Sequence, residues 1–269
     1  GLRLAALAAL ALCGAHEARR LLRGEVEVSS RDSTLSTPLE HEPAQWKVWT
    51  SGGFKGQPAE PIQHTRSSTS CRWAPLLPPP TPGLPRPSNA SICLRSSDDL
   101  LCNAILREGY WSECADLPAL HAWSTAKHAG GGMFVDVGAN IGACSLHMLL
   151  SSDAAVVAFE PGANNLFFAS SSFLRLSKSL PQVRNRLHLY PLGTGDTNSS
   201  ASLFSAVGNA GHSVIGQQPK LYAPQGHEKA QPIILRTLDD VLWPRSQRGR
   251  RPHPIALLKL DVEGYAARF

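Results

Sequence analysis

The sequence predicts an α/β fold with a parallel sheet that helices cover on both faces. Short, continuous apolar runs alternate with helix-like segments in the second half of the chain, which is typical of βαβ units. One of these runs, MFVDVGANIG at 133–142, passes directly into a glycine-rich turn. The 269 residues are 42% hydrophobic and 17% charged, so the composition allows a packed core in one large domain or two small ones.

The chain begins with an apolar segment, GLRLAALAALALCGAHEARRLLR at 1–23. Residues 4–15 are uncharged but shorter than the roughly 20 residues that span a bilayer. The segment is either the remainder of a signal peptide or signal anchor, or an ordinary helix with leucines at helical spacing. Arg19, Arg20 and Arg23 follow it, and the positive-inside rule would place the downstream side of an anchor in the cytoplasm. We expect a secretory or membrane-anchored protein, with a cytoplasmic location as the alternative.

Residues 24–95 have a composition that predicts a largely disordered linker. The segment is rich in Ser, Gly and Pro, and it holds little apolar periodicity with which to offset the loss of chain entropy on folding. The stretch PLLPPPTPGLPRP at 75–87 should form a semi-rigid polyproline-type spacer.

The six cysteines leave two interpretations open. Four of them could form two disulfides in an oxidising compartment, or could be reduced and partly buried: Cys71, Cys93, Cys102 and Cys114. Cys144, in a predicted helix, is expected to be a packed small side chain. Asn-X-Ser triplets at Asn89 and Asn198 are compatible with a luminal protein. No cysteine and histidine spacing suggests a zinc site, so no metal is predicted.

The ordered domain is predicted at 96–269. Its first helix should begin at an N-cap, Ser97, and end at Gly109. Strands are then expected at 133–137, 154–159, 187–190 and 255–260, with helices at 143–150 and 164–176 and a strand-to-helix passage in AQPIILRTLDDVL at 230–242. Because the chain stops about two helical turns after the last strand, we expect a sheet truncated after its fourth strand. That strand should be an exposed hydrophobic edge.

The glycine-rich turn indicates a nucleotide site. Asp136 lies near the end of its strand and is followed by Gly138, Asn140 and Gly142, giving D-x-G-x-N-x-G rather than the dinucleotide fingerprint. Glycines allow a ligand to approach the backbone, and the start of the next helix supplies N–H groups. Glu160 ends the next strand, 22 positions after Gly138 (160 − 138), where a carboxylate can bind both ribose hydroxyls.

The two carboxylates favour one class of nucleotide. Asp136 would repel a pyrophosphate, whereas a nucleoside with a positive charge and an amino group suits both acids. S-adenosylmethionine fits that description. An NAD(P)-dependent Rossmann oxidoreductase is the first alternative, because it shares the strand, turn, helix and later acid.

Six stretches together resemble an FkbM-type S-adenosylmethionine-dependent methyltransferase: FVDVGANIGACSLHM, VVAFEPGANN, LHLYPLGTGDTNSSASLF, GNAGHSVI, ILRTLDDVL and ALLKLDVEGYAARF. The resemblance covers 98–269. It implies a Rossmann-like class I methyltransferase sheet and methyl transfer, typically to a hydroxyl oxygen of a small molecule or glycan.

The resemblance also implies roles for individual residues. Four residues of the turn would wrap the methionine part of the cofactor: Asp136, Gly138, Asn140 and Gly142. Glu160 would hold the ribose and Asp196 would lie near the adenine, although Pro191 departs from the polar residue often found after the third strand. Asp261 and Glu263 would face the transferring methyl and the acceptor. Asn209 and His212 would lie in a loop over the site.

A hydroxyl acceptor must also lose its proton, which a carboxylate or imidazole can accept. The candidates for this base are Asp261, Glu263 and His212, in that order. A second alternative is a catalytically silent cofactor-binding module that acts through the proline-rich stalk. No nucleic-acid partner is expected: the formal charge of +5 is concentrated in local clusters such as RSQRGRR at 245–251, which is either a solvated insertion or a contact for phosphate or an acidic glycan.

Overall fold

The structure is a computed structural model. It describes residues 49–50, 53–54, 60–62, 70–79, 90–95, 99–126, 132–206, 209–216, 230–243 and 254–262. All of these lie within one compact unit, 45–269. The predicted signal or anchor segment at 1–23 is outside the described residues. Among the described helices, none combines the length and apolarity needed to cross a bilayer.

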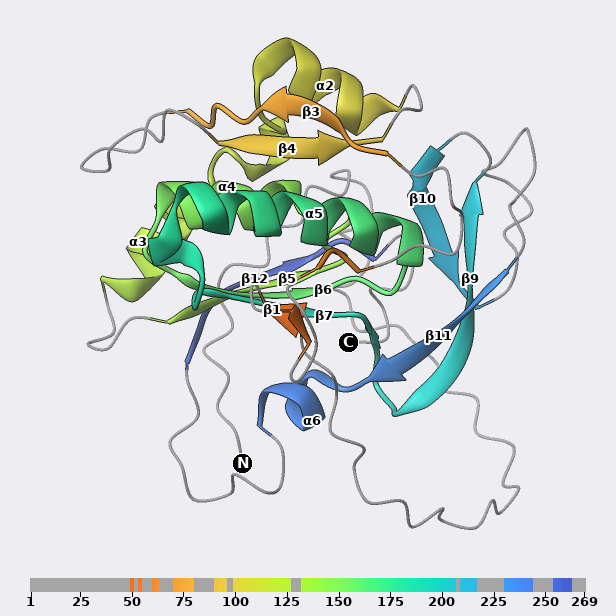
Figure 1. The fold of residues 1–269 in the computed structure, drawn as a ribbon. Helices are drawn as coiled ribbons and strands as arrows, with labels where there is room; N and C mark the ends of the chain where they lie inside the picture. The colour runs from red at the N-terminus through yellow and green to blue at the C-terminus, as the bar shows by residue number, and fades with distance from the viewer. Residues whose placement is uncertain are drawn as a thin grey trace, which may run out of the picture. The chain divides into compact units, whose positions relative to one another are not determined.

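The core of the unit is a six-stranded sheet in the order β12-β5-β6-β7-β1-β2 (Figure 1). Its first four strands run parallel and confirm the predicted ones: β12 (Ile255–Leu260), β5 (Met133–Val137), β6 (Ala155–Phe159) and β7 (Leu187–Tyr190). β1 (Trp49–Thr50) and β2 (Gly53–Phe54) extend it with antiparallel pairs. The strand order reverses between β5 and β12, and ligands of open α/β sheets bind at the carboxyl ends beside such a reversal.

Helices cover both faces of the parallel strands, as predicted (Figure 1). α4 (Ala143–Ser151) and α5 (Ala163–Ser179) lie on one face, where they pack on Phe134, Val156 and Leu189. α6 (Leu238–Leu242) lies on the other face against Val135, Val157 and Phe159. β5 sends alternate side chains to opposite faces. Asp136 therefore points toward α4.

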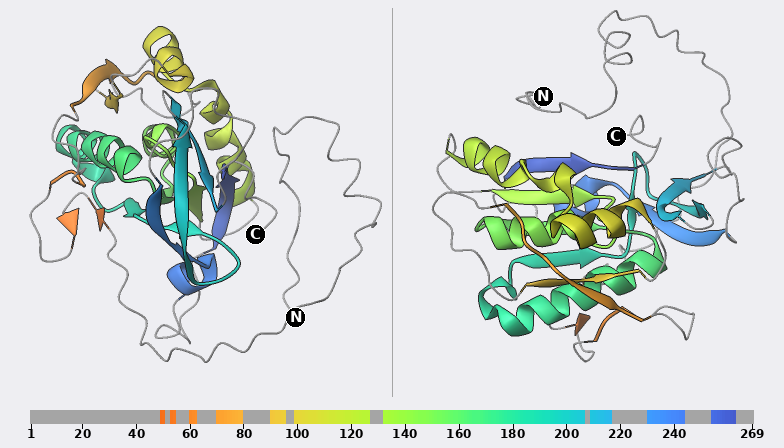
Figure 2. Two further views of the ribbon diagram at one scale, coloured as in Figure 1. Left: turned by 90° about the vertical axis from the view of Figure 1, so that its right-hand side faces the viewer. Right: turned by 90° about the horizontal axis from the view of Figure 1, so that it is seen from above.

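A second sheet stands at the carboxyl end of the parallel strands, as Figures 1 and 2 show. Its order is β10-β9-β11-β8, from β10 (Asn209–Ile215), β9 (Ser199–Ala206), β11 (Gln231–Arg236) and β8 (Gly193–Thr194). The strand predicted in 230–242 is confirmed as β11, although it belongs to this sheet. The expectation that GNAGHSVI forms a loop is wrong, because this segment pairs with β9 as a hairpin.

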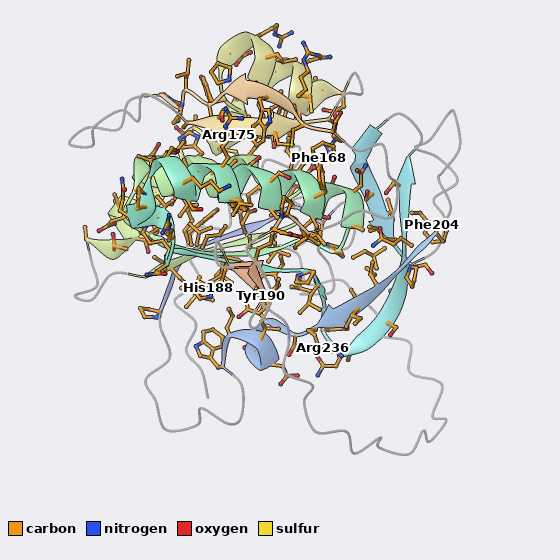
Figure 3. All side chains as sticks on the ribbon, viewed as in Figure 1. Phe168, Arg175, His188, Tyr190, Phe204 and Arg236 are labelled. Atoms are coloured by element: carbon orange, nitrogen blue, oxygen red, sulfur yellow. A yellow bond between two sulfur atoms is a disulfide. The ribbon has the colours of Figure 1, made fainter. Side chains whose placement is uncertain are left out.

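Part of the predicted linker is instead an ordered hairpin on α5. β3 (Arg72–Pro75) and β4 (Ser91–Leu94) pair antiparallel, and a disulfide joins Cys71 to Cys93. Ile92 and Leu94 are fully buried, and the N–H of Cys93 donates to Ser172 Oγ at 2.8 Å. Arg175 of α5, which Figure 3 labels, lies over the ring of Trp73, with its guanidinium carbon 4.3 Å from the ring centroid. The prediction of disorder for 24–95 is therefore wrong for the hairpin and for β1 and β2.

The hairpin could not be expected from local composition, because its stability depends on α5. The small serines of that helix let the hairpin approach closely and give it hydrogen-bond partners such as Ser172. β3 supplies Ala74 to the same core, and β4 supplies three consecutive buried residues, Ile92, Cys93 and Leu94.

Three short helices connect the hairpin to β5: α2 (Leu100–Glu108), η1 (Ser112–Cys114) and α3 (Leu117–Thr125). Asp99 is the N-cap of α2, where its carboxylate accepts from the N–H of Cys102. The predicted cap, Ser97, lies outside the described residues, whereas the predicted end at Gly109 is confirmed by its positive φ of 81°.

The cysteines form two disulfides, as one of the two interpretations held, but with a different set of partners. Cys114 of η1 bonds to Cys144 of α4, and Cys102 is a free, buried thiol. Burial raises the pKa of Cys102 to about 12. The expectation that Cys144 is only a packed side chain is wrong, because η1 lies beside α4 and brings Cys114 within reach.

Candidate functional site

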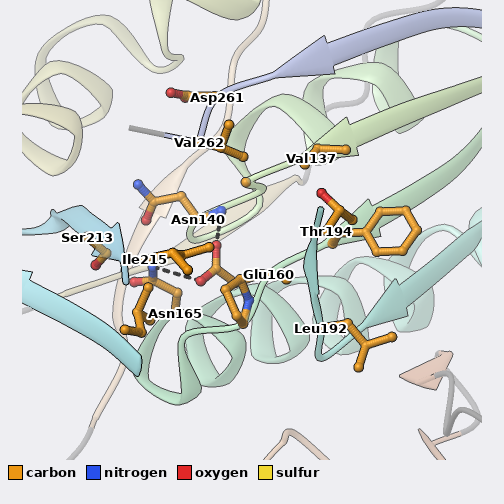
Figure 4. A pocket seen from close by; sticks show the side chains of 15 residues that line it. Val137, Asn140, Glu160, Asn165, Leu192, Thr194, Ser213, Ile215, Asp261 and Val262 are labelled. Atoms are coloured by element: carbon orange, nitrogen blue, oxygen red, sulfur yellow. Dashed lines mark hydrogen bonds between the residues drawn. The ribbon is translucent and has the colours of Figure 1, made fainter. Parts of the chain in front are cut away.

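An open cleft lies at the carboxyl ends of β5, β6 and β12, where the strand order predicts a ligand site (Figure 4). It holds about 570 Å³ of empty space, its mouth included. Its lining falls into three groups. The first comes from the strand ends, the turns that follow them and the first turn of α5: Val137, Gly138, Asn140, Phe159, Glu160, Pro161, Asn165, Asp261 and Val262. The second is the β8 segment, with Leu192, Gly193 and Thr194, and the third is the hairpin of β9 and β10, with Leu203, Ser213 and Ile215.

The glycine-rich turn has the conformation that its sequence predicts. Gly138, Asn140 and Gly142 all have positive φ, of 79°, 54° and 83°. A Cβ on Gly138 would overlap the carbonyl oxygen of Asp261, so only glycine lets the turn pass this close to the end of β12. The N–H groups of the turn are already used: Gly138 and Ala139 donate to the carbonyl of Phe159, each at 3.0 Å. The turn therefore allows a ligand to come close to the backbone at these two positions but has no free N–H group there to donate.

Asp136 lies beneath the cleft and not in its wall. Its side chain is fully buried, with Oδ2 accepting from Ser145 Oγ at 2.7 Å and Oδ1 3.3 Å from Lys259 Nζ. Lys259 is the register partner of Asp136 across β5 and β12, and its Nζ also lies 3.2 Å from Asp261 Oδ2. Burial disfavours the charged form of Lys259, but Asp136 and Asp261 outweigh it and hold the pKa of the ammonium above its usual value.

Lys259 thus joins two of the predicted acids, although the sequence reasoning did not select it. The signal was present as the one charge in the apolar strand IALLKL, which the parallel register places opposite Asp136. β12 is an edge strand, but the Lys259 side chain is only 16% exposed, and an enclosed ammonium needs a compensating acid.

Glu160 ends β6 and is 5% exposed at the floor of the cleft. Its Oε2 accepts from the N–H of Asn140 at 2.8 Å, and its Oε1 accepts from the N–H of Gly162 at 2.7 Å and from Asn165 Nδ2 at 3.3 Å (Figure 4). Burial raises the pKa of Glu160, and these three donors, with the nearby Arg95, oppose the rise. Since a carboxylate has about four acceptor positions, one remains for a ligand hydroxyl rather than two.

The remaining predicted residues divide into those that the structure brings to the cleft and those that it does not. Asp261 lines the cleft with a half-exposed side chain. Asp196 is exposed and outside the cleft, and Thr194 of the same segment lines it instead. His212 and Asn209 lie in β10, but their side chains are outside the described residues, as is the whole of Glu263.

A second ionic cluster stands on the Glu160 side. Arg95, 3% exposed, pairs with Asp99 at 2.7 Å and donates to the side-chain oxygens of Asn140 and Asn165. We call Asp99, Arg95 and Glu160 the Arg95 cluster, and Asp136, Lys259 and Asp261 the Lys259 cluster. Each contains two carboxylates and one cation, so each has a formal charge of −1 when ionised. Together the two clusters carry a formal charge of −2 when all of their groups are ionised.

The domain is thus an α/β fold whose parallel sheet has a reversed strand order, a glycine turn after β5 and an acid after β6, with a cleft at the point of reversal. The family model described as Methyltransferase FkbM domain matches residues 136–268. This segment is therefore an FkbM methyltransferase domain, as the resemblance predicted. Comparison with curated proteins and with solved structures returned no match. The β3–β4 hairpin, α2 and Arg95 precede the matched segment.

Proposed function

We propose that the cleft binds S-adenosylmethionine and that the domain transfers its methyl group to a hydroxyl oxygen of a small molecule or glycan. The observation that carries the proposal is the pair of negatively charged clusters at the carboxyl ends of the strands. S-adenosylmethionine carries a sulfonium and an ammonium against one carboxylate, so its net charge is complementary to this site. The pyrophosphate of NAD(P) would be repelled by the same charges, which disfavours the oxidoreductase alternative.

The residues present fit this cofactor. Glu160 would accept a hydrogen bond from a ribose hydroxyl, and the apolar side chains of Pro161, Leu192 and Leu203 would contact the base. Gly138 and Asn140 would lie along the methionine part, where the absence of a Cβ on Gly138 keeps the backbone close. The order of the parallel strands, β7-β6-β5-β12, is that of the first four strands of a Rossmann sheet, 3-2-1-4, and supports the same placement.

When bound, the sulfonium supplies an already activated methyl group, so the protein's main task is to orient the acceptor. Asp261 is the described candidate for removal of the acceptor proton, because it lines the cleft with a half-exposed side chain. Lys259 holds that carboxylate in place through the contact at 3.2 Å. Glu263 and His212 remain candidates for the same role.

The two disulfides support a further part of the proposal, that the protein works in the secretory pathway or at a membrane. Disulfides persist in oxidising compartments and are rare in the cytosol. The two disulfides, Cys71–Cys93 and Cys114–Cys144, hold the elements that pack on α4 and α5.

The cofactor assignment is tested by equilibrium binding of S-adenosylhomocysteine to the 269-residue chain, measured by calorimetry. Glu160→Gln should weaken binding about 10- to 100-fold, since a hydrogen bond to a charged group contributes ~1.5–3 kcal/mol. Glu108→Gln, an exposed change on α2, is the matched control. Circular dichroism should show that all three proteins are folded. Equal affinity of the two variants would remove Glu160 from the site, and a folded wild type that binds no adenosylhomocysteine would refute the proposal.

A further inference from the structure

Arg95 is a buried cation that reaches the cleft from outside the matched family segment. It follows β4 directly, and its side chain is enclosed between the hairpin, α5 and the glycine-rich turn. Its Nε donates to Asp99 Oδ2 at 2.7 Å, and its terminal nitrogens donate to Asn140 Oδ1 at 3.0 Å and to Asn165 Oδ1 at 2.8 Å. The planar guanidinium therefore bridges the turn after β5 and the helix after β6.

These contacts orient the groups that hold Glu160. A guanidinium has donors only, so each asparagine must turn its carbonyl oxygen toward Arg95. Asn165 then presents its NH₂ group to Glu160 Oε1, at 3.3 Å. Asn140 is held in its positive-φ conformation, from which its backbone N–H reaches Glu160 Oε2 at 2.8 Å. Arg95 thus orients two of the three groups that donate hydrogen bonds to Glu160, the NH₂ of Asn165 and the backbone N–H of Asn140.

Arg95 is in turn fixed by the hairpin and by α2. The Cys71–Cys93 disulfide and the bond from Cys93 to Ser172 hold the end of β4 two residues before Arg95. Asp99 pairs with Arg95 while its other oxygen caps α2. The position of the guanidinium is therefore determined by covalent and buried polar contacts rather than by the exposed surface.

We propose that Arg95 is a positioning residue of the cofactor site, which acts through Asn140 and Asn165 to set the Glu160 carboxylate for the ribose of the bound nucleoside. The inference rests on the proposed function. It extends the site to a residue of the N-terminal hairpin, which does not belong to the matched domain. Lysine cannot replace Arg95 in this role, because a single ammonium cannot bridge two amide oxygens and a carboxylate with the planar fork.

The test is a double-mutant cycle on adenosylhomocysteine affinity with the whole chain. Arg95→Lys should weaken binding about tenfold or more. The matched control is Arg107→Lys, because Arg107 is an exposed arginine on α2. Since Arg95 acts through Glu160, adding Arg95→Lys to Glu160→Gln should cause little further loss. A purely structural role would make the two losses additive and would also lower the melting temperature in proportion.

A second variant keeps the inference testable if Arg95→Lys does not fold. Asn165→Ala removes the side chain that links Arg95 to Glu160 and leaves the Arg95–Asp99 pair intact. It should also weaken adenosylhomocysteine binding, and its combination with Glu160→Gln should cause little further loss. The inference would be overturned if a folded Arg95→Lys or Asn165→Ala variant bound adenosylhomocysteine with wild-type affinity. It would also be overturned if the loss of affinity in either variant were additive to that of Glu160→Gln. If Glu160→Gln loses binding in that same experiment, the proposed function stands and only the role of Arg95 fails. If the wild type itself does not bind, the proposed function fails first.

Discussion

Gly138→Ala tests the close approach of the glycine turn to β12. Two costs follow from the structure. A positive φ of 79° costs an alanine about 1–2 kcal/mol. The new Cβ would also overlap the carbonyl oxygen of Asp261 and lie 2.9 Å from its carbonyl carbon. Since carbon atoms pack at about 3.5–4.0 Å, relief of the carbon contact alone moves the backbone of Asp261 by roughly 0.6 Å, and relief of the overlap with its oxygen requires more.

That retreat has a further energetic consequence. The N–H of Asp261 donates to the carbonyl of Val137 at 3.0 Å, and stretching this bond costs about 1 kcal/mol. The expected total loss of unfolding free energy for Gly138→Ala is therefore about 2–3 kcal/mol. It should come with weaker adenosylhomocysteine binding, because the backbone that carries Asp261 has moved.

Gly216→Ala is the matched control. Gly216 also has a positive φ, of 103°, but a Cβ there would meet no atom within 4 Å. The control should lose only the conformational cost, about 1–2 kcal/mol, and should keep its affinity. Urea unfolding followed by circular dichroism gives the stabilities, and calorimetry gives the affinities. Equal destabilisation of the two variants with unchanged binding in both would refute the reasoning about Gly138.

Three further predictions concern buried groups. Lys259→Met leaves the carboxylate of Asp136 buried without its cation and should destabilise the fold by about 3–5 kcal/mol in urea unfolding, whereas Lys178→Met, on the exposed side of α5, should cost less than about 0.5 kcal/mol. Burial lowers the pKa of His147 to about 4, below its ordinary value of 6.5, so its neutral form contributes stability that is complete above pH 6.5 and is lost as pH falls toward 4. The loss of unfolding free energy is about 3 kcal/mol. A plot of unfolding free energy against pH should therefore be flatter between pH 6.5 and 4.5 for His147→Leu than for the wild type, and an equal slope would contradict this. Removal of either disulfide, Cys71–Cys93 or Cys114–Cys144, by changing both of its cysteines to serine should lower the unfolding free energy by about 3 kcal/mol. The reason is that the two disulfides close loops of 22 and 30 residues.

The parallel strands could be predicted from the sequence because each is a short, continuous apolar run. Buried parallel strands need no partner information to be recognised, and their carboxyl ends meet at one edge. The positions of Gly138, Glu160 and Asp261 at the cleft follow from that alone.

The walls of the cleft could not be predicted in the same way. The β9–β10 hairpin has small and polar residues at many positions, SSASLFSA and NAGHSVI, so neither strand has a strong apolar alternation of its own. It forms because β9 pairs with both β10 and β11. The sequence likewise did not reveal Arg95, whose partners Asn140 and Asn165 lie 45 and 70 residues away along the chain.

The central claim is that the negatively charged cleft takes a cationic nucleoside cofactor. The measurement that tests it most directly is calorimetric titration of the folded 269-residue chain with S-adenosylmethionine and, separately, with NAD, at the same pH and ionic strength. The account predicts that S-adenosylmethionine binds, more weakly as salt screens the two clusters, and that NAD does not. Binding of NAD in preference to S-adenosylmethionine would contradict it.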